Sequence, residues 1–238
     1  MAADLTDLGA AVSAFANLNL NGADEAASLS QFSSVLFDLT RCITEAIPRH
    51  EREAILAAVA PARLRLAEVP LYHRCQTWPR GFPGDFETVE QMLGPTKCQP
   101  GTYPYYAETF FRLSVPVQQH RNKLVHQALQ IVDAWSRHGS ETRILVLACG
   151  GCADVRMILP TLAVRPPHLA LVDFDPGALE FARQQLAPIA SNCRFIQGNV
   201  VRAVAGLGTE QYHLVLAGGL FDYLSDAVIA TLLRRICQ

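Results

Sequence analysis

The sequence predicts an α/β fold in which an amino-terminal helical region precedes a parallel β-sheet with helices on both faces. Before about residue 140, apolar residues recur at helical spacing, whereas after it short, continuously apolar runs alternate with helical stretches. Continuously apolar strands that alternate with helices are typical of a parallel sheet wound right-handed. We therefore expect a helical, aromatic-rich cap over residues 1–118 and a Rossmann-like domain over residues 119–238.

The helical region contains an amphipathic stretch. From Phe32 to Ile43, apolar residues fall at positions i, i+3, i+4, i+7, i+10 and i+11, which places them on one side of a helix. Pro48 is expected to end this helix, because proline has no backbone N–H to donate. A second helix is predicted from Glu51 to Ala60, followed by Pro61.

An irregular segment is predicted next, because residues 76–118 combine aromatic side chains with several prolines and glycines. Only a short helix near Glu87–Leu93 is expected within it. A long helix then carries apolar residues on one face from Val117 to Trp135, and Gly139 closes it.

The carboxyl-terminal half contains four candidate strands, at 144–148, 169–172, 193–196 and 213–217. Helical stretches are predicted at 153–162, 176–187, 200–205 and 226–236. The alternation of the two kinds of element is what predicts the parallel sheet.

Composition narrows the function classes. The 238 residues carry 20 basic and 22 acidic side chains, so the basic excess typical of nucleic-acid binders is missing, and a small-molecule substrate is expected. No apolar run reaches the roughly 18 residues of a membrane span, and the acidic amino terminus is unlike a signal peptide. The seven cysteines form an odd set with irregular spacing, which predicts free thiols and a cytoplasmic location.

The most informative stretch is the loop after the first strand, within Arg143–Val155. Gly150 and Gly151 allow a sharp turn from strand into helix, which is where a doubly wound sheet binds its ligand. A dinucleotide fingerprint would need glycine at 148 and 150 and a small residue at 153. Ala148, Gly150 and Ala153 satisfy it only in part.

The same loop holds a C-x-x-C pair, Cys149 and Cys152. Thiol redox chemistry is one interpretation, because the amino terminus of a helix can lower a thiol pKa. A zinc site would need a second, suitably spaced ligand pair, which the sequence lacks, so no metal site is predicted. The two thiols could equally be small apolar fillers of a crowded turn.

An adenosine site is the third interpretation, supported by residues downstream. Asp173 ends the second strand 23 residues beyond Gly150, close to the spacing at which a carboxylate accepts both ribose hydroxyls. Phe174 could cover an adenine face, and Asn199, after the third strand, could hydrogen-bond the adenine amino group. Asp175, which a proline follows, is expected to cap a helix instead.

Together these residues resemble the class I S-adenosylmethionine-dependent methyltransferase family. Its first motif has an acid and three glycines, at the positions of Val146, Ala148, Gly150 and Cys152 here, so three of the four positions depart from the pattern. The resemblance implies S-adenosylmethionine as the cofactor. The residues implied to bind it are Asp85, Ala148, Cys149, Gly150, Asp154, Asp173, Phe174, Asn199, Val200, Gly218, Gly219 and Phe221.

A closer resemblance covers most of the chain. Four blocks are similar to a bacterial branch of this family: Gly81–Glu87 (GFPGDFE), His120–Arg121, Leu147–Asp154 (LACGGCAD) and Gly218–Leu224 (GGLFDYL). That branch includes proteins that make a hydroxy fatty acid methyl ester signal and enzymes that cyclise S-adenosylmethionine to azetidine-2-carboxylate. The blocks leave three functions open: methyl transfer to a small molecule of secondary metabolism or signalling, the cyclisation, and ligand binding without catalysis on the same fold.

The catalytic candidates are Tyr106, Arg121 and Tyr223. We expect aromatic side chains, Phe221 and Tyr223 among them, to cover the sulfonium cation. Asp85 and Asp154 could receive the ammonium group of the ligand, and Arg121 could hold a carboxylate with both arms of its guanidinium. The sequence identifies no general base.

A complete domain of this family has seven strands, whereas the sequence shows four before its last helix. We therefore expect either a chain that continues beyond residue 238 or a sheet that a partner chain completes. A homodimer is the assembly that this expectation suggests.

Overall fold

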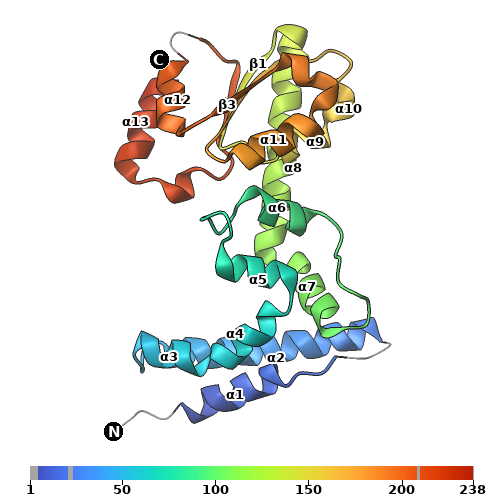
Figure 1. Cartoon of the computed structure of the whole chain (residues 1–238), viewed down its shortest axis with the longest axis vertical. Coiled ribbons are helices and arrows are strands. Elements are labelled where there is room, and N and C mark those ends of the chain that lie inside the picture. The colour runs from blue at the N-terminus through green and yellow to red at the C-terminus, as the bar shows by residue number, and fades with distance from the viewer. Residues whose placement is uncertain (1–4, 21–23, 208–209, 238) are drawn as a thin grey trace. The chain divides into compact units, whose positions relative to one another are not determined.

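The computed structural model describes residues 5–20, 24–207 and 210–237. The chain divides into two compact units, Met1–Gln118 (unit 1) and Gln119–Gln238 (unit 2). Figure 1 follows the chain from the helices of unit 1 to the sheet of unit 2. No helix among the described residues is long and apolar enough to cross a membrane.

Unit 1 is made of helices joined by short loops. They are α1 (Thr6–Ala16), α2 (Glu25–Ala46), α3 (Arg52–Ala58), α4 (Ala60–Ala67), α5 (Pro70–Thr77), α6 (Phe86–Leu93) and α7 (Tyr103–Leu113), and α8 (Val115–His138) begins here and continues into unit 2. The Asp24 carboxylate caps α2 by accepting a hydrogen bond of 3.0 Å from the backbone N–H of Ala27. The predicted amphipathic helix is confirmed, and it ends just before Pro48.

Two predictions for unit 1 are wrong. The segment 76–118 is not irregular beyond α6, because Tyr103–Leu113 forms α7. Its proline lies in the first helical turn, where a missing N–H breaks no hydrogen bond, and its aromatic residues recur at helical spacing. Pro61 likewise does not end a helix: α3 ends at Ala58, and the proline lies in the first turn of α4.

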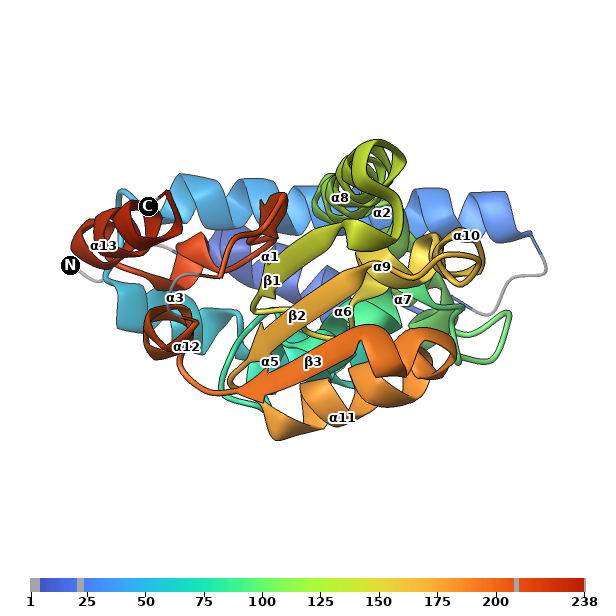
Figure 2. The ribbon, with the colours of Figure 1, turned by 90° about the horizontal axis from the view of Figure 1, so that it is seen from above.

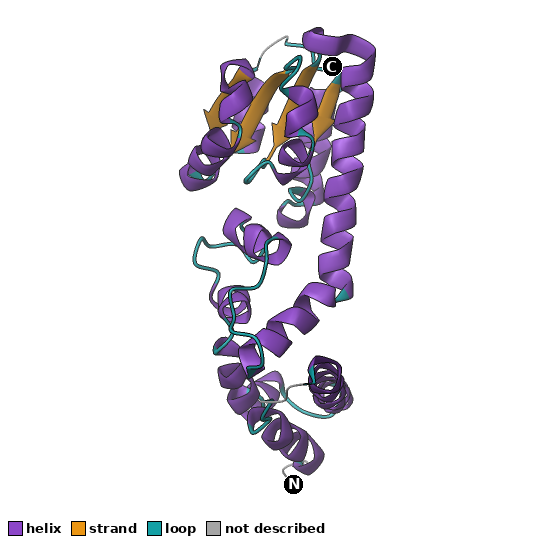
Figure 3. Cartoon of the chain, turned by 90° about the vertical axis from the view of Figure 1, so that its right-hand side faces the viewer, coloured by secondary structure: helices purple, strands orange, loops and turns teal. Residues whose placement is uncertain are grey.

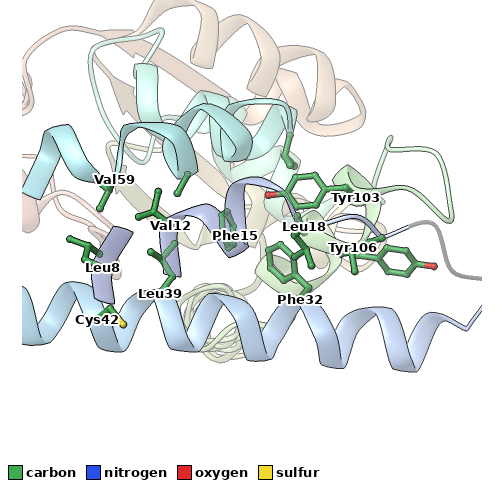
Figure 4. Close-up of a cluster of buried hydrophobic side chains, with 14 of the residues drawn as sticks. Leu8, Val12, Phe15, Leu18, Phe32, Leu39, Cys42, Val59, Tyr103 and Tyr106 are labelled. Atoms are coloured by element: carbon green, nitrogen blue, oxygen red, sulfur yellow. The ribbon is translucent and has the colours of Figure 1, made fainter. Parts of the chain in front are cut away.

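The core of unit 1 joins α1, α2 and α7 through aromatic rings (Figure 4). Phe15 meets Phe32 edge to face, with 5.9 Å between the ring centroids, and Tyr103 lies 5.9 Å from Phe32 on another side. Such contacts add to the burial of three large side chains. The core therefore depends on α7, which lies in the segment that the sequence pattern predicted to be irregular.

Unit 2 is built on a parallel sheet with the strand order β3-β2-β1-β4 (Figure 3). The strands are β1 (Arg143–Leu147), β2 (His168–Asp173), β3 (Cys193–Gln197) and β4 (Leu214–Leu216). Leu147 pairs with Val172, and Asp173 pairs with Gln197, so β1, β2 and β3 end together at one edge of the sheet. The predicted α/β class and the four strands are confirmed.

Helices connect these strands and follow the last one. They are α9 (Ala153–Met157), α10 (Leu159–Leu162), α11 (Pro176–Gln185), α12 (Val200–Gly206) and α13 (Asp226–Ile236), with 3-10 segments η1 (Gly139–Glu141), η2 (Ala187–Asn192) and η3 (Phe221–Tyr223). The single helix predicted over 153–162 is in fact two. The break lies at Ile158, since Pro160 lies in the first turn of the second helix and cannot continue the first.

The sheet separates two apolar layers because side chains alternate along a strand. Ile144 and Val146 of β1 face a layer that includes Ile131 of α8 together with residues of α9, α10 and α11. Leu145 and Leu147 face the other layer, with residues of α12 and α13. Figure 2 shows α11 running along β3, and this helix contacts both β2 and β3.

Candidate functional site

The carboxyl edge of the sheet collects the polar groups that the sequence singled out in unit 2. Parallel strands place their carboxyl ends on the same edge, and in open α/β sheets ligands bind there. The loop after β1, the residues after β2 and β3, and the glycines after β4 all lie at this edge.

The loop after β1 has a distinctive backbone. Ala148, Gly150 and Cys152 each have a φ of +52°, the left-handed region that favours glycine. These are the three positions at which the resembled motif has glycine. The loop thus has the backbone of a glycine-rich loop at all three positions, although two carry a side chain, at a cost of about 1–2 kcal/mol each.

Asp173 joins this loop to the end of β2. Its Oδ2 accepts a hydrogen bond of 2.8 Å from the Gly150 backbone N–H, and its Oδ1 accepts one of 2.9 Å from the Asp175 backbone N–H. The Cys149 N–H also donates to the carbonyl oxygen of Val172, at 3.0 Å. Two neighbouring loops are therefore fixed to each other through one carboxylate.

The Asp173 carboxylate still has capacity for a ligand. Each carboxylate oxygen can accept about two hydrogen bonds, and each accepts one here. Burial raises the pKa of Asp173, while the backbone N–H donors oppose that shift. Two ribose hydroxyls fit this acceptor set, since each could donate to one oxygen beside a backbone N–H.

The residues that follow β2 and β3 have different environments: one caps a helix, one is exposed and one is buried. Asp175 caps α11 by accepting a hydrogen bond of 2.7 Å from the backbone N–H of Gly177, as predicted. Phe174 has 66% of its surface exposed at this edge. Val200, in contrast, is buried in the apolar layer with α12 and α13.

Asn199 caps α12 with its side-chain oxygen. The oxygen accepts hydrogen bonds from the backbone N–H groups of Val201 at 3.0 Å and Arg202 at 3.3 Å. An amide oxygen has two lone pairs, so the cap uses its full capacity as an acceptor. Asn199 therefore meets a ligand as a donor through its amide N–H groups, and an adenine ring nitrogen suits it better than the amino group.

The C-x-x-C pair does not have the properties of a reactive thiol. Cys149 and Cys152 are buried, and neither is in a disulfide. A hydrogen bond with Cys149, followed by burial, raises the pKa of Cys152 well above its ordinary value, the opposite of what activates a thiolate. Among the described residues no cluster of metal-binding side chains occurs. Both cysteines belong to the apolar layer that includes α9, as small fillers.

Near the end of β4 lie two residues of α8, Gln127 and Lys123, that the sequence pattern did not predict as site residues. A Cβ at Gly218 would lie 2.3 Å from Nε2 of Gln127, and a Cβ at Gly219 would lie 3.7 Å from Nζ of Lys123. A side chain at 218 would therefore require the Gln127 amide to move from its present position. The two glycines let polar side chains of α8 approach the strand end closely.

Lys123 lies near two carboxylates. Burial lowers the pKa of Lys123, and the charges of Asp222 and Asp154 oppose that shift. Asp154, with 4% of its surface exposed, has its pKa raised by burial, although the Val155 N–H donates to its Oδ1 at 2.9 Å. Burial thus holds the Lys123 ammonium group and the Asp154 carboxylate partly away from water.

One signal in the sequence could have found these α8 residues. His120, Lys123 and Gln127 recur at i, i+3 and i+7, which places them on one face of the helix. Near them, Leu124 and Ala128 are buried apolar neighbours. Polar residues that interrupt the buried side of an otherwise apolar helix indicate a site or a satisfied polar network.

The remaining predicted residues belong to η3 after β4, to α8 and to the core of unit 1. Phe221 and Tyr223 belong to η3, with 37% and 45% of their surfaces exposed, and Arg121 is a partly buried residue of α8. Tyr106 is 2% exposed in the core of unit 1 (Figure 4). This burial gives Tyr106 a packing role, and we leave it out of the proposed site.

Asp85, predicted to bind a ligand ammonium group, caps a helix of unit 1. It accepts a hydrogen bond of 2.9 Å from the Thr88 backbone N–H at the start of α6. It also forms a buried ion pair with Arg74, with 2.8 Å between Nη2 and Oδ1. Its second oxygen is buried without a hydrogen-bond partner among the described residues. The PGDFE block therefore has a structural function whether or not it binds a ligand.

Comparison with known proteins adds evidence about the fold. No protein-family model matches the sequence, and no curated protein matches it. Among solved structures, a possible exported protein from Bordetella parapertussis is 22% identical over 74% of this chain and 58% of its own, with a TM-score of 0.50. At this identity the similarity concerns the fold alone.

Two other solved structures align with lower TM-scores. The DszA carbon methyltransferase is 16% identical over 98% of this chain and 65% of its own, with a TM-score of 0.44. A TehB-like SAM-dependent methyltransferase from Corynebacterium glutamicum is 17% identical over 51% of this chain and 62% of its own, with a TM-score of 0.34. TM-scores below 0.5 carry no argument about this chain. This chain spans less than two thirds of the length of all three proteins.

Proposed function

We propose that this chain is an S-adenosylmethionine-dependent enzyme, most readily a methyltransferase that acts on a small molecule. One observation carries the proposal: the left-handed loop after β1 is fixed by the hydrogen bond between Gly150 N–H and the Asp173 carboxylate. This arrangement presents a partly buried acceptor beside a tight turn, which is what a ribose needs at the edge of a doubly wound sheet.

The neighbouring groups fit the rest of an adenosine. The exposed ring of Phe174 can lie against the adenine face, and the amide N–H groups of Asn199 can donate to a ring nitrogen. Stacking and one or two directed hydrogen bonds are enough to orient a base in such a site. A dinucleotide fits this loop less well, because the side chains at 148 and 152 restrict the close approach of a pyrophosphate.

The strand order supports a position for the reactive part of the ligand near β4. Asp173 and Asn199 follow β2 and β3 on one side of β1, whereas Gly218 and Gly219 follow β4 on its other side. A ligand with its adenosine over β2 and β3 extends its sulfonium toward β4. When bound, S-adenosylmethionine supplies there a methyl carbon activated by the positive sulfur.

The residues after β4 can serve that chemistry by positioning and by excluding water. Phe221 and Tyr223 offer aromatic faces, which attract a cation without reacting with it. Arg121 on α8 is the proposed group for a carboxylate of the acceptor. Holding the reactants in line accounts for much of the rate of such a displacement.

Cyclisation is the second candidate, because the Gly218–Leu224 block is similar to a branch in which both chemistries occur and does not choose between them. This reaction needs an unprotonated α-amino nitrogen folded toward the carbon next to sulfur. An aromatic cover made by Phe221 and Tyr223 would favour the neutral amine by excluding water. Ligand binding without turnover is the remaining alternative.

Incubating the purified chain with S-adenosylmethionine alone, and analysing the products by mass spectrometry, separates these functions. Cyclisation yields methylthioadenosine together with azetidine-2-carboxylate, whereas transfer yields S-adenosylhomocysteine only when an acceptor is added. A sample without protein corrects for spontaneous breakdown of the cofactor, and an Asp173→Asn variant tests whether turnover uses this site. Tight binding of NADH with no binding of S-adenosylmethionine would overturn the proposal.

Partner and location remain predictions. A homodimer and a cytoplasmic location both rest on sequence patterns, and the seven unpaired thiols are compatible with a reducing compartment. Sedimentation of the purified chain would test the dimer.

A further inference from the structure

We propose that His138, His213 and the Arg143 backbone form an acid-sensitive contact, which holds the start of β4 against β1 at neutral pH and releases it when His213 is protonated. We call this group the histidine contact. It lies at the amino-terminal edge of the sheet, opposite the candidate site, since His213 precedes β4 and Arg143 begins β1. The inference goes beyond the proposed function, because it concerns how β4 is held and not what the site binds.

The first support is a pair of hydrogen bonds between His213 and Arg143. The Arg143 backbone N–H donates to Nδ1 of the His213 ring at 2.9 Å, and the His213 backbone N–H donates to the Arg143 carbonyl oxygen at 2.9 Å. A ring nitrogen accepts a hydrogen bond only while it carries no proton, because both nitrogens of a charged imidazole are donors. Protonation of Nδ1 therefore breaks one of the two bonds and turns two N–H groups toward each other.

The second support is the stacking of the two histidine rings. The His138 ring, in the last turn of α8, lies against the His213 ring with 4.0 Å between the centroids and 21° between the planes. The stack thus joins the end of α8 to the segment before β4. Two charged imidazole rings at this distance repel each other, so acid weakens the stack as well as the hydrogen bond.

The third support is that the surroundings of His213 oppose a positive charge on it. Desolvation by the neighbouring groups lowers the pKa of His213, and the charges of His138 and Arg143 lower it further. Among the described residues, no other charge acts on His213. The remaining titratable groups on the segments that meet here are Asp133 and Arg137 of α8, Glu141 of η1, Arg194 of β3, and Glu210 and Tyr212 before His213.

The length of β4 makes this contact important for the strand. β4 pairs with β1 through three residues, Leu214, Val215 and Leu216, and it stands at the end of the strand order. The two hydrogen bonds of His213 therefore extend a short ladder at its first residue. Because β4 leads into Gly218 and Gly219, its release would also free the segment that follows it.

The sign of the pH effect follows from the direction of the shift. Since folding lowers the pKa of His213, the unfolded or opened segment binds the proton more tightly. The contact is therefore complete above the ordinary histidine pKa of about 6.5, and it weakens as pH falls below that value.

Amide hydrogen exchange measured by mass spectrometry tests the inference on the ligand-free chain. Peptides that contain β4 are compared at about pH 7.5 and about pH 5.5, after correction for the intrinsic effect of pH on exchange. His213→Asn is the informative variant, because its side-chain oxygen can accept the Arg143 N–H bond and cannot be protonated in this range. His126→Asn is the matched control, because it replaces an exposed histidine of α8 outside the contact.

We expect β4 of the wild type to open up to about tenfold more often at the lower pH. One proton changes an equilibrium by at most about that factor over one unit below the ordinary pKa. His126→Asn should behave as the wild type does, whereas the change in His213→Asn should stay below about twofold, because the proton-dependent step is gone. Peptides of β3, at the other end of the strand order, should respond less than those of β4.

Three results would overturn the inference: β4 exchange in the wild type that does not depend on pH, an unchanged pH response in His213→Asn, or an equal acceleration in β3. If circular dichroism shows that His213→Asn does not fold, NMR titration of the wild-type rings takes its place. Opening of β4 must then follow the titration of His213, and a different midpoint would contradict the inference. These measurements involve no nucleoside, so the proposed function and this inference can fail independently.

Discussion

The backbone N–H of Gly150 donates a hydrogen bond of 2.8 Å to Oδ2 of Asp173, and this contact fixes the turn after β1 to the end of β2. It uses one acceptor position of a carboxylate whose other oxygen is held by the Asp175 N–H. A ligand that reaches Asp173 therefore meets an acceptor that is already oriented, so little conformational entropy is lost on binding.

Replacing this carboxylate tests both of its functions. Asp173→Asn should lower the free energy of unfolding by about 1–3 kcal/mol, because the amide presents an NH₂ group to one of the two backbone N–H donors. It should also weaken S-adenosylhomocysteine binding at least about tenfold, through loss of a charged acceptor for the ribose. Urea unfolding and calorimetry measure the two effects.

Asp175→Asn is the matched control for that substitution. It removes a carboxylate two residues away, but asparagine caps helices about as well as aspartate, so stability should change by less than about 0.5 kcal/mol. Equal losses of nucleoside affinity in the two variants would show that the local charge, and not the Asp173 contacts, determines binding.

The left-handed conformation of Ala148 predicts an unusual response to glycine. Ala148 is exposed, and its φ of +52° costs an L-residue about 1–2 kcal/mol, whereas glycine adds about 0.5–1 kcal/mol of backbone entropy to the unfolded chain. Ala148→Gly should therefore leave the free energy of unfolding unchanged or raise it by up to about 1 kcal/mol. Urea unfolding at constant pH gives the value.

Ala230→Gly, in the middle of α13, provides the comparison. That alanine is exposed and helical, so glycine should destabilise the chain there by about 1 kcal/mol. If both substitutions destabilise alike, the backbone conformation of the loop does not govern the effect at 148.

Burial of Asp154 makes a prediction about pH. The folded-state pKa lies above that of the unfolded chain, so the folded state binds the proton more tightly, and stability falls as pH rises through that interval. Asp154→Asn keeps the acceptor for the Val155 N–H and cannot ionise. It should be more stable than the wild type near pH 7, and the difference should shrink as pH falls toward the ordinary aspartate pKa of about 4, because protonation removes the buried charge.

Urea unfolding of both proteins at the two pH values measures this difference. Asp133→Asn removes an exposed acid on α8 and should change stability by less than about 1 kcal/mol. A wild type that is more stable than Asp154→Asn near pH 7 would contradict the assignment of Asp154 as a group whose charge is unfavourable in the folded chain without ligand.

The buried ion pair of unit 1 gives a prediction that is independent of any ligand. Arg74 and Asp85 are 12% and 3% exposed, so Arg74→Met leaves a buried carboxylate without its cation and should destabilise unit 1 by about 3–5 kcal/mol. Trp78 lies in unit 1 and Trp135 in unit 2, so Trp78 fluorescence in a Trp135→Phe background reports unit 1 alone.

Arg41→Met is the control within the same unit. Arg41 is exposed and pairs with Asp38 and Glu45 along α2, so its loss should leave stability close to that of the wild type. A loss at Arg74 no larger than at Arg41 would show that the buried pair is not a main support of unit 1.

Hydrophobic periodicity predicted the regular elements of this chain well, and it failed where other forces compete. The strands of unit 2 and α13 lie where the apolar runs predicted them. The strands have continuous apolar runs because helices cover both faces of a parallel sheet. The pattern missed α7, since its tyrosines and proline are typical of irregular segments until a core covers the aromatic face. It also missed the break at Ile158, which one proline causes.

The candidate site was predictable wherever a residue follows a strand. Gly150, Asp173 and Asn199 occupy positions that the chain order and spacing indicate, because the carboxyl ends of parallel strands share an edge. Their hydrogen bonds were not predictable in the same way: Asn199 meets a ligand as a donor only because the cap of α12 uses its oxygen.

The sequence by itself determined the α/β class, the four strands and the loop that turns after β1, since burial and turn geometry act on residues close together in the chain. Tertiary structure decided which polar groups meet. Lys123 and Gln127 lie about 90 residues before Gly218 and Gly219, and only the packing of α8 beside the β4 end brings them together. Contacts at such separation depend on the path of the whole chain, which no local pattern contains.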